Sequence, residues 1–399
     1  MKYSKSTKLT AIATIGLVIG ALAGCTASKT EDTEKVDIGL LMPLTGAYAP
    51  PGKDMKDAVE LYLDLHHNKL GGRDVDVHYG DEGDSPKTSV PEAKRLLNKY
   101  KVDVMAGAAS SANYAAVAPE TVKHEIPFIG IGGQPDLKQM GLDNEWLWQA
   151  AVLPDRSGVA MAPYIASHVK GPVYAIGPDY VGGYAIVGGF VKPFLKAGGQ
   201  LANPSGQPTW TPWPKTKDYS KYFQEIAQSN AKAIYSFYLG QPAVDFVKQY
   251  AKSEVKDIPM YSSFLTEGPS LEAEGASAKG IYTAMNYSPD IDNAANRRFV
   301  SDWSNKYPDR QTNFYSLDGW DTVHILDQAI GRIDKDKKVT GATINEALGH
   351  LGTIDSPRGT WQFSEKTHAP VQKWYLRQVA GDGPSLSNVV IQELATLDG

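Results

Sequence analysis

The chain has 399 residues, and its 40 basic and 45 acidic side chains give a formal net charge of −5. That length allows two domains of ordinary size with hydrophobic cores. The acidic balance argues against nucleic acid or an anionic lipid surface as the partner, because both require a basic face. With one cysteine in the sequence, an intramolecular disulfide is excluded.

The N-terminus has the pattern of an export signal that ends in a lipid attachment site. Three lysines precede an apolar stretch over 9–23 that is too short to span a bilayer, and Leu-Ala-Gly-Cys at 22–25 has the form of a bacterial lipobox. The alternative, that Cys25 is a small buried hydrophobe, would leave the charged and apolar segments unexplained. We therefore predict a lipoprotein signal peptide over 1–24, a diacylated Cys25 and a flexible tether over 25–35.

From Val36 onward, short apolar runs alternate with amphipathic stretches of helical period. The helix expected after Thr45-Gly46 is predicted to stop at Gly71-Gly72. The other expected elements of this half are strands at 36–42, 75–79, 102–107 and 126–131, and helices near 87–99 and from about 111. This alternation predicts a parallel sheet sandwiched by helices.

A second series with the same order begins after Pro154. The expected helices are 155–169, 183–196, 219–228 and 241–252, and the expected strands are 173–176, 233–238 and 259–262. Two α/β halves predict a cleft between domains, where small ligands usually bind. The stretch 203–218, with Trp210 and Trp213, is expected to be the only long irregular loop. It is either a surface flap packed by its own aromatic residues or a ligand contact.

Motifs for catalysis, metals and nucleotides are weak. The histidines form no metal-binding spacing, so no metal or cofactor is expected. Phe-Ile-Gly-Ile-Gly-Gly at 128–133 shares two glycines with a dinucleotide loop, but Pro135 stands at the third position. Neither a nucleophile elbow nor a phosphate loop occurs. The acidic pair Asp81-Glu82 lies in polar turn sequence and is expected to be solvated. We therefore do not expect an enzyme.

The strongest local signal lies at 104–113, where a strand ends in a Gly/Ala turn and Ser110 and Ser111 precede a helix. Free backbone N–H groups, the positive end of a helix dipole and two hydroxyls would together bind a carboxylate. A serine that only caps the helix is the simpler interpretation. Both can hold, because one hydroxyl can cap while its neighbour faces the cleft.

In this order the motifs resemble a known family, the leucine/isoleucine/valine-binding solute-binding proteins, which are extracytoplasmic receptors of ABC importers. The resemblance rests on Ile38-Gly39-Leu40-Leu41-Met42-Pro43-Leu44-Thr45-Gly46, Gly71-Gly72, Asp81-Glu82, the serine pair, Ile126-Pro127-Phe128-Ile129-Gly130 and Asp318-Gly319 before a helix. It implies an α/β, two-lobed type I periplasmic-binding-protein fold, in which each lobe is a parallel sheet flanked by helices and a hinge joins them at a central cleft. The implied lobes are 36–150 plus 286–356 and 151–285 plus 357–399.

The resemblance also implies a ligand site. Family members hold a ligand carboxylate on the serine turn and on the next strand-end loop, which here are Ser110, Ser111, Gly132 and Gly133. Aromatic residues of the second lobe cover the ligand, and the corresponding positions here are Tyr180 and Tyr238, while Tyr48 lines the first loop. For each tyrosine a core position is the alternative, since the chain has 21 of them.

One departure from the family bears on the ligand class. Amino-acid-binding members place a glutamate near residue 261 against the ligand ammonium, whereas this chain has Phe264. An apolar side chain cannot balance a buried cation, unless Glu267 or Asp179 substitutes. Segments 264–267 and 355–359 resemble the subgroup associated with aromatic acids. The sequence therefore favours an aromatic or other non-amino carboxylate over a branched-chain amino acid, with an amide as a third alternative.

The expected function is that of a monomeric receptor of an ABC importer, anchored by its N-terminal lipid, with a small carboxylate as ligand and a membrane permease as partner. A sensor module that reports ligand occupancy to a membrane partner would use the same fold. An exported enzyme would need a nucleophile with a base, or a metal, and the sequence offers neither.

Overall fold

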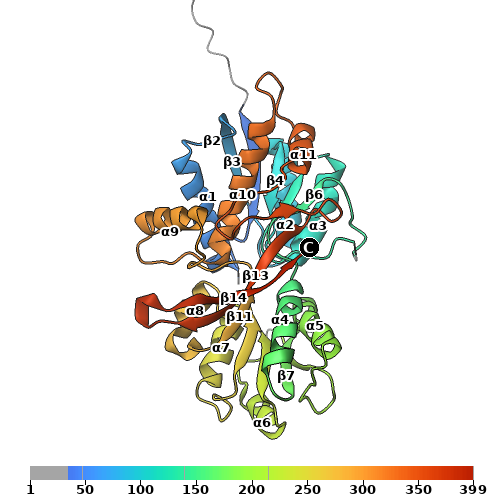
Figure 1. Cartoon of the computed structure of the whole chain (residues 1–399). Helices are drawn as coiled ribbons and strands as arrows, with labels where there is room; N and C mark the ends of the chain where they lie inside the picture. The colour runs from blue at the N-terminus through green and yellow to red at the C-terminus, as the bar shows by residue number, and fades with distance from the viewer. Residues whose placement is uncertain (1–34, 47, 139, 214, 399) are drawn as a thin grey trace, which may run out of the picture. The chain divides into compact units, whose positions relative to one another are not determined.

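The computed structural model describes residues 35–46, 48–138, 140–213 and 215–398. The predicted signal peptide, the lipobox with Cys25 and most of the predicted tether lie outside the described residues. The described strands form two sheets, each flanked by helices (Figure 1). None of the described helices combines the length and the apolar character that crossing a membrane requires.

The first sheet is built from the N-terminal part of the chain. Its strands are β1 (Val36–Met42), β2 (Lys69–Leu70), β3 (Arg73–Asp81), β4 (Val104–Gly107), β5 (Phe128–Gly130) and β6 (Leu147–Gln149). Their order is β2-β3-β1-β4-β5-β6, and all neighbours are parallel except β2 and β3. The central strands are apolar along their length because helices cover both faces of a parallel sheet.

Helices from two distant parts of the sequence cover this sheet (Figure 1). They are α1 (Ala49–Leu65), α2 (Pro86–Arg95) with a π-helical turn over Leu96–Tyr100, α3 (Ser111–Lys123), α9 (Ala294–Lys306), α10 (Phe314–Arg332) and α11 (Gly341–Gly349). α1 and α10 pack so closely that a Cβ on Gly319 would lie 2.0 Å from the carbonyl oxygen of Met55. The largest core joins side chains of β1 and α1 to those of α9, α10 and α11.

The second sheet contains the remaining strands. These are β7 (Val173–Asp179), β8 (Thr209–Pro212), β9 (Ala233–Phe237), β10 (Met260–Ser263), β11 (Tyr282–Met285), β12 (Gln362–Phe363), β13 (Pro370–Ala380) and β14 (Ser387–Leu397). Their order is β12-β13-β11-β10-β9-β7-β8, with β14 also paired to β13. Strands β7 to β11 are parallel, whereas β13 is antiparallel to β11, β12 and β14.

The helices of the second sheet fall into two groups. They are α4 (Arg156–His168), α5 (Val181–Lys196), α6 (Ser220–Gln228), α7 (Gln241–Tyr250) and α8 (Pro269–Glu274), with 3₁₀ turns at Gly275–Ala278 and Gly383–Ser385. One core joins α4 and α5 to the sheet, and a separate core joins α6, α7 and α8 to it. Helices on both faces explain why these strands, too, are almost entirely buried.

Three connections run between the two sheets, and a buried polar cluster ties them together. Gln372 of β13 accepts a hydrogen bond from Asn286 at 2.9 Å and one from Arg358 at 2.6 Å, and donates to the carbonyl of Ala151 at 2.8 Å. Arg358 also donates to the carbonyl of Ala150 at 2.6 Å. The lobe boundaries implied by the family resemblance fall in these connections and stay a prediction.

The first half differs from the sequence-based expectations by the additional short strands β2 and β6 and at the ends of two helices. Gly71 and Gly72 do not stop a helix: α1 ends at Leu65, and the two glycines, with φ of 59° and 78°, form the turn between β2 and β3. The helix expected over 87–99 ends at Arg95 and continues as the π-helical turn.

Two further expectations, both about later segments, were wrong. The stretch 203–218 contains β8, and it is not the only long irregular segment, because 131–146 also has no helix or strand among its described residues. Asp318-Gly319 does not precede a helix but lies inside α10.

Candidate functional site

The serine turn connects β4 to α3 through strained backbone. Gly107 has φ of 125°, and a Cβ there would lie 2.0 Å from the carbonyl oxygen of Leu41, so only glycine fits. Ala108 adopts a left-handed φ of 57°. Ser110 is the N-cap residue of α3, yet its side chain makes no capping hydrogen bond. The hydroxyl of Ser110 therefore remains able to bind a ligand.

Glu82, which follows β3, occupies part of this turn. Its carboxylate accepts hydrogen bonds from the backbone N–H groups of Ala109 and Ser110, both at 2.8 Å, and from the amide of Asn113 at 2.9 Å. The side chain is 1% exposed, and burial raises the pKa of Glu82 to about 7 although these hydrogen bonds lower it. The expectation that Glu82 is solvated was wrong, and two N–H groups expected to be free are engaged.

The loop after β5 meets the serine turn. The hydroxyl of Ser111 donates to the carbonyl of Gly133 at 2.7 Å, and the N–H of Gly132 donates to Asp318 of α10 at 3.0 Å. Within the described residues, the hydroxyl of Ser110 and the N–H groups of Ser111 and Gly133 have no hydrogen-bond partner. These three donors lie on two loops that touch each other, and they are the available set for a carboxylate.

Aromatic rings form a continuous series from the second sheet to α10. Centroid distances are 4.9 Å for Trp213 and Tyr180, 6.4 Å for Tyr180 and Phe237, 6.2 Å for Phe237 and Phe264, 5.5 Å for Phe264 and Phe314, and 5.4 Å for Phe314 and Tyr315. Phe264 directly follows β10 and has φ of 58°, an uncommon conformation for a bulky residue. A held strain of this kind is typical of functional sites.

Three tyrosines from separate elements come within electrostatic range of one another. Tyr48 immediately precedes α1, Tyr180 is the N-cap of α5, and Tyr315 lies in the first turn of α10. Burial raises the pKa of Tyr180 well above its usual value, and Tyr48 and Tyr315 raise it further. Burial and the charges of Glu82 and Asp84 raise the pKa of Tyr48 to about 12.

All three rings are partly exposed, and among the described residues none of their hydroxyls has a hydrogen-bond partner. Their hydroxyls are therefore available to form a hydrogen bond with a ligand. Sequence reasoning missed Tyr315, although its position two residues after Asn313, a capping residue, marks the start of a helix.

Tyr238 does not belong to this group. It is fully buried, its ring lies 4.5 Å from that of Phe246, and its hydroxyl lies 3.2 Å from that of Thr211. The residue directly follows β9 and points into the core between the second sheet and α7, whereas its neighbour Phe237 belongs to the core on the other face. The core interpretation left open for Tyr238 is the one that the structure supports.

Neither acidic residue expected as a substitute for the missing glutamate is free. Glu267 is 2% exposed and pairs with Arg377 of β13. Asp179 is exposed and accepts a hydrogen bond from the hydroxyl of Tyr184. Asp318 is a third acid, and sequence reasoning did not find it as a site residue because it lies inside an amphipathic helix.

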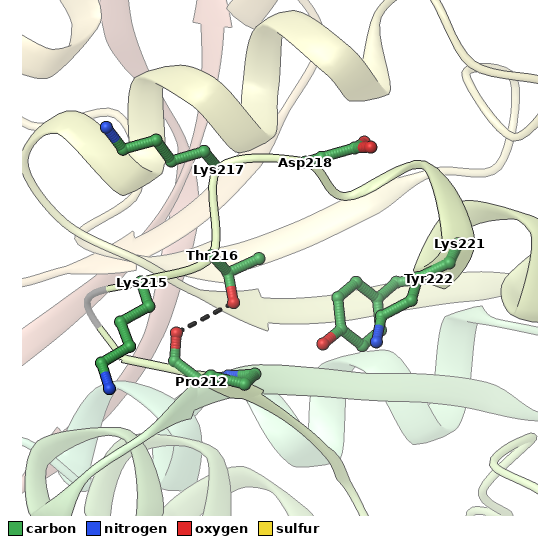
Figure 2. Close-up of a pocket in the computed structure, with 7 residues that line it drawn as sticks. All are labelled: Pro212, Lys215, Thr216, Lys217, Asp218, Lys221 and Tyr222. Atoms are coloured by element: carbon green, nitrogen blue, oxygen red, sulfur yellow. Dashed lines mark hydrogen bonds between the residues drawn. The ribbon is translucent and has the colours of Figure 1, made fainter.

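A separate hollow of about 320 Å³ lies on the loop after β8 (Figure 2). It is lined by Pro212, Lys215, Thr216, Lys217, Asp218, Lys221 and Tyr222. The lysine side chains point in different directions, and the hydrogen bond drawn joins the hydroxyl of Thr216 to the carbonyl of Pro212 at 2.9 Å. The hollow shares no residue with the site above. No group of three or more His, Cys, Asp or Glu side chains suited to a metal occurs in the described part of the chain.

The chain matches known proteins over most of its length. The family described as periplasmic binding protein matches residues 35–384. A Leu/Ile/Val-binding protein homolog 6 of Brucella suis is 25% identical over 382 residues, which cover 94% of this chain and 93% of that protein.

Solved structures also match this chain over most of its length. An ABC transporter solute-binding protein from R. palustris, in complex with benzoate, is 26% identical with a TM-score of 0.81 and covers 92% of this chain and 98% of that chain. A substrate-binding protein of an ABC transporter from Sphaerobacter thermophilus is 22% identical with a TM-score of 0.84, and the match covers 92% of this chain and 99% of that chain. At this identity the match shows that the two proteins share a fold.

These matches confirm the family resemblance and the α/β two-lobed type I fold that the sequence predicted. The R. palustris protein is a solute-binding protein of an ABC transporter, and the periplasmic binding protein family implies an extracytoplasmic location. The chain belongs to the periplasmic binding protein family, with the leucine/isoleucine/valine-binding proteins among its relatives.

Proposed function

We propose that this protein is the receptor of an ABC importer, anchored to the cell membrane by lipid on Cys25, and that it delivers an aromatic or other non-amino carboxylate to a membrane permease. The observation that carries the ligand class is the series of aromatic rings, which reaches from Trp213 to Tyr315 on α10, one turn before Asp318. The benzoate complex of the R. palustris relative supports the same class.

In this proposal the carboxylate binds to the hydroxyl of Ser110 and to the N–H groups of Ser111 and Gly133. These donors have no partner among the described residues. Ser110 and Ser111 lie at the N-terminus of α3, where the helix dipole favours an anion, and Gly133 faces them from the loop after β5. Gly132 contributes by its bond to Asp318, which fixes the loop, rather than by its own N–H.

The ring of the ligand would lie among Tyr48, Tyr180, Phe264 and Tyr315. Offset or edge-to-face contacts between aromatic rings contribute about 0.5–1.5 kcal/mol beyond area burial. Trp213, in the loop after β8, stacks on Tyr180 with an interplanar angle of 22° and so helps to fix the orientation of the Tyr180 ring.

A branched-chain amino acid is the second candidate, and one observation favours it. Asp318 lies beside the loop that would hold the carboxylate, where an α-ammonium would also lie. Against it, Glu267 is committed to Arg377, and an ammonium without a charge partner is costly to bury.

A thermal-shift series with benzoate, 4-hydroxybenzoate, benzamide, leucine and valine tests the proposal. A ligand at 100 times its dissociation constant adds about 2.7 kcal/mol of stability. We expect the two benzoates to raise the melting temperature and benzamide to have little effect. If only leucine or valine raises the melting temperature, the ligand is a branched-chain amino acid and the aromatic class is wrong. If none of these carboxylates raises it, the proposed carboxylate site is wrong.

A further inference from the structure

Asp318 is a buried acid with one unused oxygen at the carboxylate end of the proposed site. Its Oδ2 accepts the N–H of Gly132 at 3.0 Å, and its side chain is 3% exposed. Its Oδ1 has no hydrogen-bond partner among the described residues, and it is not among the fully enclosed atoms that lack one. Oδ1 is therefore free to bond a ligand group that reaches the loop held by Gly132.

The charges around Asp318 do not balance. Arg358, the nearby cation, forms an ion pair with Asp321 at 3.0 Å, and both side chains are 2% exposed. The hydroxyl of Ser356 also donates to Asp321 at 2.8 Å. The guanidinium of Arg358 also donates hydrogen bonds to the side chain of Gln372 and to the carbonyl of Ala150. Two buried carboxyl groups thus share one cation, and that cation is bound to Asp321.

The other groups that face Asp318 add no positive charge. Tyr315 lies on the same helix one turn before Asp318. Glu267, from the loop after β10, raises the pKa of Asp318 through its negative charge. From the loop after β5, Asp318 receives only a backbone N–H. Burial is the main cause that raises the pKa of Asp318 well above its usual value, and Asp321 and Glu267 act in the same direction against Arg358.

A ligand carboxylate on Ser111 and Gly133 would bring a further negative charge next to Asp318. Two adjacent carboxyl groups in a buried site do not both stay ionised, because like charges disfavour the charged form. We propose that Asp318 contacts the ligand carboxylate as a neutral acid and donates a hydrogen bond from its Oδ1 to it. The inference rests on the proposed function, since it requires a carboxylate ligand at this end of the site.

The pH dependence of benzoate affinity, measured by calorimetry from pH 6 to 10, tests the inference. Benzoate is ionised throughout this range, so the proton must be carried by the protein. We expect constant affinity at the acidic end and a fall towards tenfold per pH unit once free Asp318 ionises, with proton uptake from the buffer over the same interval. Binding that is independent of pH would overturn the inference alone. Absence of benzoate binding at every pH would contradict the proposed function as well.

Two substitutions show which side chain carries the proton. Asp318→Asn keeps an acceptor for Gly132 and cannot ionise, so it should bind benzoate with a flat pH profile. Glu82→Gln removes the other buried acid near the serine turn, and its profile should keep the fall. A flat profile in Glu82→Gln together with an unchanged profile in Asp318→Asn would overturn the inference. Tight leucine binding that is lost in Asp318→Asn would do so too, because Asp318 would then act as an anion.

Discussion

Arg377 of β13 and Glu267, which follows β10, form an ion pair with side chains that are 1% and 2% exposed. Arg377 also donates to the carbonyl of Tyr287 at 2.6 Å and to the hydroxyl of Thr283. The pair joins the antiparallel hairpin at the end of the chain to the parallel strands of the second sheet. It also removes the acid that stands nearest in sequence to Phe264 from any role as a ligand counter-ion.

Breaking this pair should destabilise the fold strongly. Glu267→Gln leaves the guanidinium of Arg377 buried without its counter-charge, a change that typically costs about 3–5 kcal/mol. Urea denaturation of the purified protein measures the loss. The matched control is Lys373→Met, which breaks the pair with Glu393 on the same hairpin; both of those side chains are more than 40% exposed, so the loss should be at most about 1 kcal/mol. Equal losses in the two variants would contradict the prediction.

The two serines of the turn should behave differently when replaced. Ser110→Ala removes a hydroxyl without a partner, so stability should hold while benzoate affinity falls by about 1.5–3 kcal/mol, the range for a hydrogen bond to a charged group. Ser111→Ala also cuts the bond to Gly133 and should lower both stability and affinity. Calorimetry and thermal melting of the two variants separate these effects. Unchanged affinity in Ser110→Ala would remove its hydroxyl from the site.

The unpartnered tyrosine hydroxyls should be dispensable for folding. Tyr180→Phe and Tyr315→Phe should change the free energy of unfolding by no more than about 0.5 kcal/mol, because each keeps the ring and breaks no hydrogen bond among the described residues. Their effect should show instead as a changed affinity ratio between 4-hydroxybenzoate and benzoate.

The control for this pair is Tyr287→Phe. The hydroxyl of Tyr287 bonds to Asn296 at 3.0 Å and to Thr312 at 2.9 Å in a fully buried position. Its loss leaves buried polar groups unpaired and should cost about 1–3 kcal/mol. An affinity ratio that stays the same in both Tyr180→Phe and Tyr315→Phe would show that these hydroxyls do not face the ligand.

Lipid anchoring depends on one atom, the thiol of Cys25. Cys25→Ser should release the protein from the membrane fraction and leave benzoate affinity as it is, because none of the residues proposed to contact the ligand lies within 25–35. Fractionation after a high-salt wash, followed by immunoblotting, measures the change. A variant that stays with the membrane would contradict the lipobox interpretation.

The regular elements were accessible from sequence because both sheets are covered on both faces. Strands such as β1 and β7 are therefore apolar runs bounded by polar turns, and these stand out without a structure. The two-lobed arrangement was predicted from the resemblance to the family, in which the motifs occur in the same order. Short strands such as β2 and β8 were missed because a few residues carry no periodicity.

The polar part of the site was harder to predict, because its partners are far apart in sequence. Glu82 lies in a polar turn and looks solvated, yet its three donors come from residues 109–113. Asp318 sits inside α10, where an acid usually faces solvent. Tyr180 and Tyr238 have similar surroundings in sequence, and only the packing of α6 and α7 decides that the second is a core residue.

The return of α9, α10 and α11 to the first sheet has a consequence for biosynthesis. The largest core contains Val36 near its beginning and Trp361 near its end, so it lacks much of its apolar surface until nearly the whole chain has left the ribosome. Contacts between segments so distant in sequence form slowly, since a long loop must close first. The nascent chain thus stays without its main core during most of synthesis, a state that suits a polypeptide destined for export. A fragment ending at residue 290 should accordingly show no cooperative thermal transition for the first sheet.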